Sequence, residues 1–396
     1  MMDELYFDHA ATTPCDPRVR AVMLAALEGE DGNPHSTTHA AGRKAAQAVE
    51  QARAEVAALI GADPREIIFT SGATEANNLA IKGAARHLAA LGSPRRRVIT
   101  CATEHKCVLE SVRDLAQEGF EPVILPVNAD GRVNPDSLRA ALEVPTALVS
   151  LMAANNETGV LQDLATLAPL VEQAGALLHS DLAQAAGKIP VDVRRMGLAL
   201  GSLSSHKLYG PKGAGALFVR RRPRVRLSPL FSGGGQERGL RSGTLPGFLL
   251  AGFGAACRIA REEGPKDAAH LAHLRDIFLA RIRLGLPGAV VNAEAAPHLP
   301  GLFSLRLPEG LGAQDVIAAM PGLAVSLGSA CSSAEIAPSY VLEAMGLGRD
   351  EAGRSLRLSP GRFTSAAEAE RAADMLVQAA AEVRGHARAP ETVAGG

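Results

Sequence analysis

The chain has 396 residues, of which 47% are hydrophobic and 21% are charged, a balance typical of globular proteins that are long enough for two domains. Its formal net charge is −1, so no overall field favours binding to nucleic acid or to an anionic membrane. The longest apolar run, 245–257, is too short and too rich in glycine to span a bilayer. We therefore expect a cytoplasmic protein with neither a membrane nor a nucleic acid as its partner.

The five cysteines are scattered along the chain and include no Cys-x-x-Cys pair. This usage is typical of reduced thiols in a cytoplasm, and it predicts neither a disulfide framework nor a zinc or other metal site. The N-terminus is acidic and lacks the basic and apolar regions of a signal peptide. One basic run, 220–226, follows an apolar segment, and we interpret it as a solvated edge or a protein contact in preference to an RNA site.

Short apolar segments alternate with amphipathic segments through the first half of the chain. Asp16 and Pro17 are typical of a helix N-cap and first turn, and they open a predicted helix that ends near Leu27; a second helix is predicted over 40–60. Beyond it we predict strands at 66–70, 97–102, 122–127, 147–152 and 176–179, separated by helices at 74–91, 108–118, 135–142 and 164–174. This alternation predicts an α/β fold with a mostly parallel sheet covered on both faces.

A second, smaller α+β domain is predicted from the longer helical pattern that follows. This pattern runs from residue 245 to 284, and weaker strand signals return at 302–307, 323–327 and 355–358 before a closing helix at 366–383. We predict a large domain over 16–258, a small domain built from 1–15 and 259–385, and a disordered tail over 386–396.

Lys207 lies near the middle of a segment, 202–215, that joins two apolar stretches, so a tight connection between two buried strands is expected there. A partly buried lysine loses its proton more readily, and its neutral amine can attack a carbonyl carbon, as a Schiff-base lysine does. The alternative is a solvated turn residue. The polar residues at the other strand ends favour the chemical role.

The turn 71–75 is one such strand end. It consists of small and polar residues, among them Ala73 and Thr74, and it leads from a strand into a helix. Free backbone N–H groups at a helix start attract anions, and the helix dipole adds to the attraction. We therefore predict a phosphate site there, although many such turns bind nothing.

Three further strand ends carry groups suited to cofactor chemistry. Asp181 can cap a turn, or it can hold a proton on a ring nitrogen as pyridoxal phosphate requires, with Gln184 near the ring hydroxyl. His105 stands between two cysteines at a spacing that does not fit zinc, so we favour a histidine that stacks on a ring or moves protons. Asn156 follows a fourth strand. The presence of polar groups at several strand ends favours a cofactor site more strongly than any one of these residues does.

The second half of the chain adds candidates for phosphate, sulfur and carboxylate chemistry. Arg241 and Thr244 follow a flexible glycine run and offer a guanidinium and a hydroxyl to a phosphate. Cys331 is surrounded by Gly, Ser and Ala, which predicts a reactive thiol on an exposed loop in place of a packed one. Arg357 and Arg362 are both able to bind a substrate carboxylate through two hydrogen bonds.

Together these motifs resemble the pyridoxal-phosphate-dependent cysteine desulfurases of the NifS/IscS type, within the class V aminotransferases. The resemblance spans almost the whole chain and is carried by residues 7–14, 32–34, 69–75, 104–106, 155–157, 205–213, 233–244 and 328–331. It implies the aminotransferase-like type I fold for pyridoxal phosphate, with a mostly parallel seven-stranded sheet in the large domain. It also implies a homodimer with active sites at the subunit interface.

The resemblance further implies a role for each candidate. Lys207 is the Schiff-base lysine, Asp181 the partner of the ring nitrogen, and His105 the stacking acid/base. Cofactor phosphate is bound by Thr74, Ser204 and His206, with Thr244 coming from the other subunit. Ala73 also contacts the cofactor, while Gln184 and Asn156 meet the ring hydroxyl or the substrate. Arg357 binds the carboxylate of L-cysteine. Cys331 accepts the sulfur as a persulfide and passes it to an acceptor such as an iron–sulfur scaffold protein, leaving L-alanine.

Alternatives remain open at this point. A selenocysteine lyase or an aminotransferase would use the same cofactor, although transamination needs no thiol at Cys331. A cofactor-free sulfur carrier or interaction protein is the alternative from another class. The tail after Gly385 does not resemble the C-terminal extension that docks the scaffold protein in the IscS branch, so the sulfur acceptor stays open.

Overall fold

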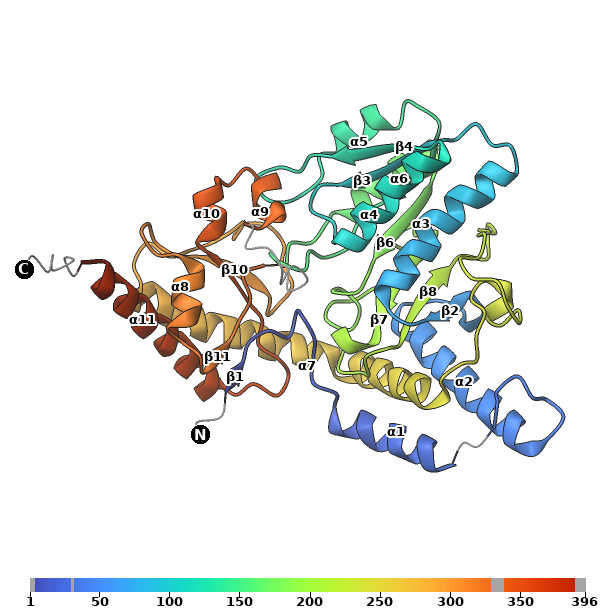
Figure 1. Ribbon diagram of the computed structural model, residues 1–396, viewed down its shortest axis with the longest axis horizontal. Coiled ribbons are helices and arrows are strands. Elements are labelled where there is room, and N and C mark those ends of the chain that lie inside the picture. Colours follow the sequence, from blue (N-terminus) through green and yellow to red (C-terminus); the bar gives the residue numbers. More distant parts are fainter. Residues whose placement is uncertain (1–3, 30–31, 329–337, 389–396) are drawn as a thin grey trace, which may run out of the picture. The chain divides into compact units, whose positions relative to one another are not determined.

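The computed structural model describes residues 4–29, 32–328 and 338–388 (Figure 1). The chain divides into a larger compact unit, Thr12–Asn155 with Val160–Pro265, and a smaller one, Met1–Ala11 with Asn156–Gly159 and Lys266–Gly396. Helix α7 (Gly247–Gly285) contributes to both. Cys331 and most of the predicted tail lie outside the described residues.

The larger unit is built on a seven-stranded sheet whose described strands stand in the order β2-β8-β7-β6-β5-β3-β4. β8 runs antiparallel to both of its neighbours, and the other pairs are parallel. The strands are β2 (Ile67–Thr70), β3 (Arg97–Cys101), β4 (Glu121–Leu125), β5 (Thr146–Ser150), β6 (Leu177–Asp181), β7 (Leu200–Ser204) and β8 (Gly215–Val219). The predicted α/β class with a mostly parallel sheet is confirmed.

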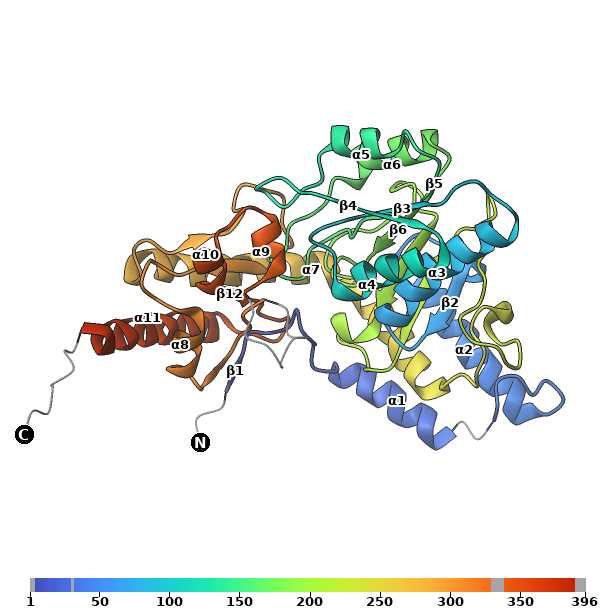
Figure 2. The same cartoon turned by 45° about the horizontal axis from the view of Figure 1, so that its top comes forward.

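Two helices pack on this sheet through their apolar faces. Figures 1 and 2 show α3 (Ala73–Ala90) beside α4 (Lys106–Asp114), and the apolar side chains of both join those of the strands in one buried cluster. The predicted helix at 108–118 starts earlier and is α4 followed by a 3₁₀ turn. The remaining helices of this unit are α1 (Pro17–Gly29), α2 (Ala40–Leu59), α5 (Pro135–Ala141), α6 (Leu164–Gln173) and the first part of α7.

A polar ladder crosses three neighbouring strands inside the larger unit. His179 on β6 is fully buried, and its two ring nitrogens lie 2.8 Å from Ser150 Oγ on β5 and 2.9 Å from Ser202 Oγ on β7. Burial lowers the pKa of His179 to about 3, so the ring is neutral at physiological pH. Because both nitrogens are bonded, the ladder holds the three strands in register near their carboxyl ends.

The smaller unit has a three-stranded antiparallel sheet, β12-β10-β9, and a parallel pair, β1-β11. Its core includes Phe7, Phe278 and Phe303. The centre of the Phe278 ring lies 6.1 Å from that of Phe7 and 5.6 Å from that of Phe303. Its strands are β1 (Leu5–Tyr6), β9 (Val290–Val291), β10 (Phe303–Arg306), β11 (Leu323–Ala324) and β12 (Ser355–Leu358). Its helices are the end of α7, α8 (Ala313–Ala318), α9 (Tyr340–Ala344), α10 (Arg349–Gly353) and α11 (Ala366–Arg388).

The strand predicted at 323–327 is shorter than expected, since β11 ends at Ala324 and Ser326 makes only an isolated bridge to Arg357. Among the helices that the structure describes, none combines the length and the apolar composition needed to cross a membrane.

Candidate active site

The carboxyl ends of the parallel strands meet at one edge of the large sheet, and most of the predicted site residues follow them. Thr74 follows β2 in the first turn of α3, His105 follows β3, Asp181 is the last residue of β6, and Lys207 follows β7. Asn156, predicted to join them, belongs to the smaller unit. The larger unit therefore gathers four of these five groups at the edge where ligands of open α/β sheets bind.

Lys207 lies on a tight turn, as predicted from its sequence setting. It is the last residue of a 3₁₀ turn, Ser205–Lys207, that follows β7. The turn is held from the N-terminal segment, because the Thr13 hydroxyl donates to the main-chain oxygen of His206 at 2.9 Å and accepts the N–H of Tyr209 at 2.7 Å. Tyr209 has a φ of 64°, which costs free energy for a residue with a side chain. Such strain is typical of functional turns.

His206 shares this turn and was predicted to bind phosphate. Burial, followed by the charges of Lys207, Lys212 and Lys188, lowers the pKa of His206 to about 4. Its Nδ1 lies 3.0 Å from the Thr12 hydroxyl. The neutral ring can therefore give a phosphate a hydrogen bond, while positive charge in this region comes from the lysines.

The start of α3 forms an open cradle. Its N-cap, Gly72, provides no side-chain cap, and a Cβ placed on Gly72 would meet no atom within 4 Å. On the other side, a Cβ on Gly215 would lie 2.5 Å from the Gly72 Cα, so β8 approaches this turn as closely as only glycine allows. Unfilled space thus lies before a helix N-terminus, as an anion site requires.

Arg241, a candidate for binding phosphate, forms an ion pair with Glu75. Its Nε donates to the Glu75 carboxylate at 2.9 Å, and Glu75 also accepts the N–H of Ser71 at 2.8 Å. Arg241 therefore ties the segment 233–244 to the turn before α3. It stabilises the turn at the start of α3 through Glu75, which accepts the N–H of Ser71.

Asp181 is buried and held from two sides. Its Oδ1 accepts the N–H of Ala183 at 2.9 Å, and its Oδ2 accepts Nδ2 of Asn77 at 2.7 Å. Asn77, on α3, was missed by the sequence analysis, because one buried amide on an otherwise apolar helix face gives no periodic signal. Gln184 is also buried, and its Oε1 accepts a hydrogen bond from the Lys188 ammonium at 2.6 Å.

His105 caps the start of α4. Its Nδ1 accepts the N–H of Cys107 at 3.2 Å and lies 3.0 Å from Cys107 Sγ. The preceding Glu104 is fully buried and accepts the N–H of Met152. Burial and, second, the charge of Asp181 raise the pKa of Glu104 to about 8. The described residues contain no group of His, Cys, Asp and Glu side chains that could hold a metal ion.

The smaller unit holds Arg357, which is buried on β12. Its guanidinium donates to Asp8 Oδ1 at 2.8 Å and to the main-chain oxygen of Asn156 at 3.1 Å, and its Nε has no hydrogen-bond partner among the described residues. Arg362 pairs with Asp267 at 2.7 Å. Arg357 therefore lies beside another predicted substrate residue, whereas Arg362 is tied to the middle of α7.

Cys331, the predicted sulfur acceptor, lies outside the described residues. The residues on both sides of its segment contact Glu157. Ser339 Oγ donates to the Glu157 carboxylate, and a Cβ on Gly328, which has a φ of +123°, would lie 2.7 Å from Glu157 Oε2. Glu157 thus binds Ser339 and lies close to Gly328, a position that sequence reasoning did not assign.

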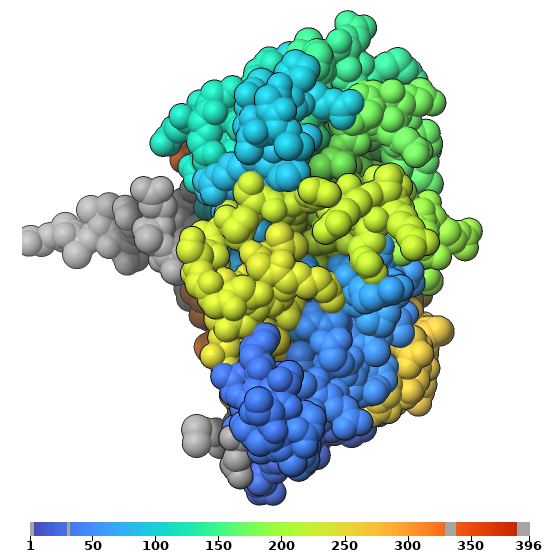
Figure 3. All heavy atoms as spheres, turned by 90° about the vertical axis from the view of Figure 1, so that its right-hand side faces the viewer, coloured from blue at the N-terminus to red at the C-terminus, as the bar shows by residue number. Residues whose placement is uncertain are grey.

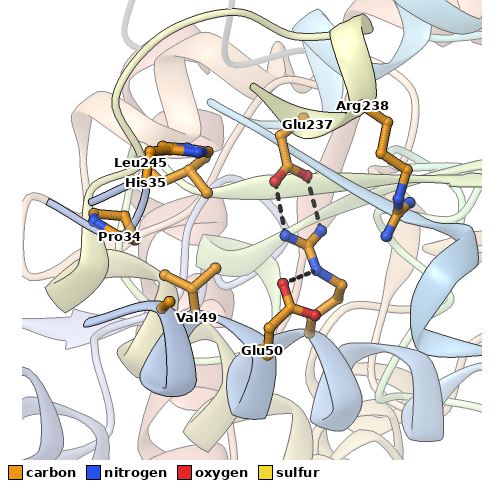
Figure 4. Close-up of a pocket in the computed structure, with 9 residues that line it drawn as sticks. Pro34, His35, Val49, Glu50, Glu237, Arg238 and Leu245 are labelled. Carbon is orange, nitrogen blue, oxygen red and sulfur yellow. Dashed lines mark hydrogen bonds and ion pairs between the residues drawn. The ribbon is translucent and has the colours of Figure 1, made fainter. Parts of the chain in front are cut away.

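Thr244 is exposed on the larger unit, at the end of the segment 233–244. Figure 3 shows this segment, in yellow, on the surface beside the blue residues of α2. A buried ion pair anchors it: Glu237 accepts two hydrogen bonds from Arg53, at 2.8 and 2.7 Å, and a third from the N–H of Phe69 at 2.6 Å. Figure 4 shows this pair at the wall of a pocket of about 240 Å³ that Leu245 and His35 also line.

Comparisons with known proteins agree with the resemblance seen in the sequence motifs. The sequence profile of the Aminotransferase class-V family matches residues 5–371. The mitochondrial cysteine desulfurase of Arthroderma benhamiae is 50% identical over 372 residues, which cover 93% of this chain and 73% of that protein. The cysteine desulfurase IscS of Rickettsia felis is 47% identical over 372 residues, covering 94% and 90%.

Solved structures of similar proteins have the same fold as this chain. A NifS-like protein superposes on the chain with a TM-score of 0.87 at 34% sequence identity, covering 95% of this chain and 98% of the other. The predicted type I fold and the predicted family are both confirmed. The chain belongs to the Aminotransferase class-V family and, within it, to the cysteine desulfurases.

Proposed function

We propose that the chain binds pyridoxal phosphate along the carboxyl edge of its large sheet. Three features of the larger unit fit this group. The open cradle before α3 suits a phosphate. The donors to the Asp181 carboxylate, from Asn77 and Ala183, are neutral, so its charge stays available for a protonated ring nitrogen. Lys207 supplies a primary amine on a held turn.

The residues then divide the work as follows. When bound, pyridoxal phosphate supplies an electrophilic carbon and a ring that withdraws electrons from the substrate. Lys207 would bind that carbon through Nζ, and Asp181 would hold a proton on the ring nitrogen. His105 would stack on the ring and move protons at Nε2, because its Nδ1 already accepts the N–H of Cys107. Contacts to the phosphate, the ring hydroxyl or the substrate come from Ala73, Thr74, Ser204, His206, Gln184 and Asn156.

L-cysteine is the proposed substrate, in line with the activity that the names of the similar proteins state. Arg357 binds its carboxylate, with the unpartnered Nε as one donor. The C–S bond of the substrate breaks and an S–S bond forms to Cys331. The two thiol hydrogens end on the methyl group of L-alanine and on the persulfide, so the exchange needs no external oxidant.

The observation that carries this proposal is the placement of Lys207 and Asp181 at the ends of the neighbouring parallel strands β7 and β6. The test is to incubate the protein and pyridoxal phosphate with L-cysteine and to quantify L-alanine. We expect alanine from the wild type and from the control Lys266→Ala, an exposed lysine, and none from Lys207→Ala. Undiminished alanine from Lys207→Ala would contradict the proposal, and an oxo acid in place of alanine would support the aminotransferase alternative.

We also propose a homodimer in which Thr244 serves the partner's site. Thr244 is exposed, and so are Leu24 and Leu27 on α1, as expected of surfaces that a second copy covers. Mixing subunits provides the test. A hybrid of Lys207→Ala with Thr244→Ala contains one site with an intact lysine and an intact threonine, so the purified hybrid should recover about half of the wild-type activity although each parent variant is poorly active. No recovery in confirmed hybrids would show that Thr244 acts within its own subunit.

The persulfide, we propose, passes to an iron–sulfur scaffold protein or another sulfur acceptor in a reducing, cytoplasmic compartment. All four cysteines that the structure describes are free thiols, which supports such a compartment. Radiolabelled sulfur from L-cysteine should move from the enzyme to the thiols of a true acceptor and not to a scrambled control protein. Selenocysteine offered in the same assay would show whether selenium is preferred.

A further inference from the structure

We propose that Asn77 is a positioning residue that holds Asp181 and, through Cys107, His105 in one hydrogen-bonded chain beneath the cofactor. The inference rests on the proposed pyridoxal phosphate site, because it assigns a task toward that group. Asn77 does not reach the site itself. It lies on α3, fully buried, behind the two residues that face the ring.

Both protons of the Asn77 amide are used. One is donated to Asp181 Oδ2 at 2.7 Å, and the other to Cys107 Sγ at 3.2 Å. The amide cannot be turned the other way round, since this would place Oδ1 against the Asp181 carboxylate, two acceptors with no proton between them. In the observed orientation Oδ1 has no hydrogen-bond partner. An unpaired buried carbonyl is unfavourable, so the two donated bonds must hold the side chain in place.

The chain continues from Cys107 to His105. Cys107 Sγ accepts a hydrogen bond from Asn77 and lies 3.0 Å from His105 Nδ1. We assign the thiol as the donor in this second contact, because Nδ1 already accepts the main-chain N–H of Cys107. The Cys107 N–H donates to the same nitrogen at 3.2 Å. Two donors on Nδ1 leave the ring proton of a neutral His105 on Nε2. The order of donation therefore runs from Asn77 outward, to Asp181 on one side and through Cys107 to His105 on the other.

This arrangement has a chemical consequence at the ring nitrogen. The Asn77 N–H stabilises negative charge on Asp181 and fixes the direction of its oxygens. Without this hydrogen bond, Asp181 would hold a proton on the ring nitrogen of a bound cofactor less firmly. The chemistry that the bound group would supply, withdrawal of electrons from the substrate, would weaken accordingly.

The test compares Asn77→Ala, Asn77→Ser and Cys107→Ala with Asn292→Ala. Asn292 is a matched control: it is buried in the smaller unit and donates to Ser304 Oγ at 2.9 Å and to Ser355 Oγ at 3.0 Å. The readouts are the nitrogen NMR signal of isotope-labelled pyridoxal phosphate in the holoenzyme, and the nitrogen signals of His105 in the protein before loading. Neither signal responds to a loss of stability alone.

Both Asn77 variants should shift the ring-nitrogen signal toward the unprotonated form and lower kcat by about tenfold or more, the usual effect of losing a hydrogen bond to a charged group. Cys107→Ala should move only the His105 signals, and Asn292→Ala should move neither. Asn77→Ser covers the case in which Asn77→Ala does not fold. A wild-type ring-nitrogen signal in the folded Asn77 variants would overturn the inference. Absence of bound cofactor in the wild type would instead refute the proposed function.

Discussion

The buried ion pair between Arg53 and Glu237 should be among the most sensitive points of the larger unit. Their side chains are only 4% and 2% exposed. Glu237→Ala leaves the Arg53 guanidinium buried without its carboxylate and leaves the N–H of Phe69 without its acceptor. Removing one partner of such a pair costs about 3–5 kcal/mol in the free energy of unfolding. For a unit of this size, the corresponding fall in Tm is on the order of 10 °C.

The structure gives a reason for this sensitivity. Glu237 and Arg238 adopt φ angles of 47° and 59°, which are unfavourable for residues with side chains, so the segment 233–244 needs an anchor to keep its shape. The Arg53 guanidinium also lies 4.6 Å from the centre of the Phe69 ring, and donates to the main-chain oxygen of Ile67 at 2.9 Å. The pair thus joins α2, β2 and the segment that carries Thr244.

Urea unfolding followed by far-UV circular dichroism is the suitable assay, because the chain has no tryptophan for fluorescence. The control is Glu110→Ala, which removes an exposed ion pair with Arg113 and should cost less than about 1 kcal/mol. Replacing both partners, by Arg53→Met with Glu237→Leu, should restore most of the loss, since no charge is then left buried alone. If Glu237→Ala were as mild as Glu110→Ala, the reasoning about this anchor would be wrong.

Three further predictions concern the site. Asp181→Asn should keep the cofactor but lower kcat by about tenfold or more, because an amide cannot hold the ring-nitrogen proton; wild-type kcat would reduce Asp181 to a turn cap. Burial raises the pKa of Glu104 from an ordinary 4.5 to about 8 in the folded protein. Between these pH values the folded protein keeps a proton that the unfolded chain has lost, so the free energy of unfolding falls as pH rises through this window. Glu104→Gln should remove that fall in urea unfolding measured at several pH values, and an unchanged pH dependence would show that another group causes it. Arg357→Lys should raise the KM for L-cysteine by about tenfold or more through loss of bidentate binding, whereas Arg362→Lys should leave KM nearly unchanged; the reverse pattern would assign the carboxylate to Arg362.

The sheet and the strand-end residues were predictable because they rest on local patterns. Apolar runs of four to six residues bounded by turn residues located β2 to β8, and a lysine or aspartate just beyond such a run marks the ligand edge of a parallel sheet. Lys207 and Asp181 were found in this way. The two-residue strands β1 and β9 were missed, because two residues are too few to show any periodicity.

The supporting contacts were not predictable, because they join residues far apart in sequence. Arg53 and Glu237 are separated by 184 positions, and Asn77 and Asp181 by 104. A buried amide or carboxylate carries no mark of the partner that makes its burial tolerable. The same holds for the ion pair of Arg241 with Glu75, which are separated by 166 positions.

The central claim, that this chain takes sulfur from L-cysteine onto its own thiol, is tested most directly by the intact mass of the protein after incubation with pyridoxal phosphate and L-cysteine. The wild type should gain one sulfur atom that a reductant removes, and peptide mapping should place it on Cys331. Cys331→Ser should bind the cofactor as the wild type does, gain no sulfur, and form no alanine beyond the background. Alanine and sulfide formed at the wild-type rate by Cys331→Ser would contradict the account.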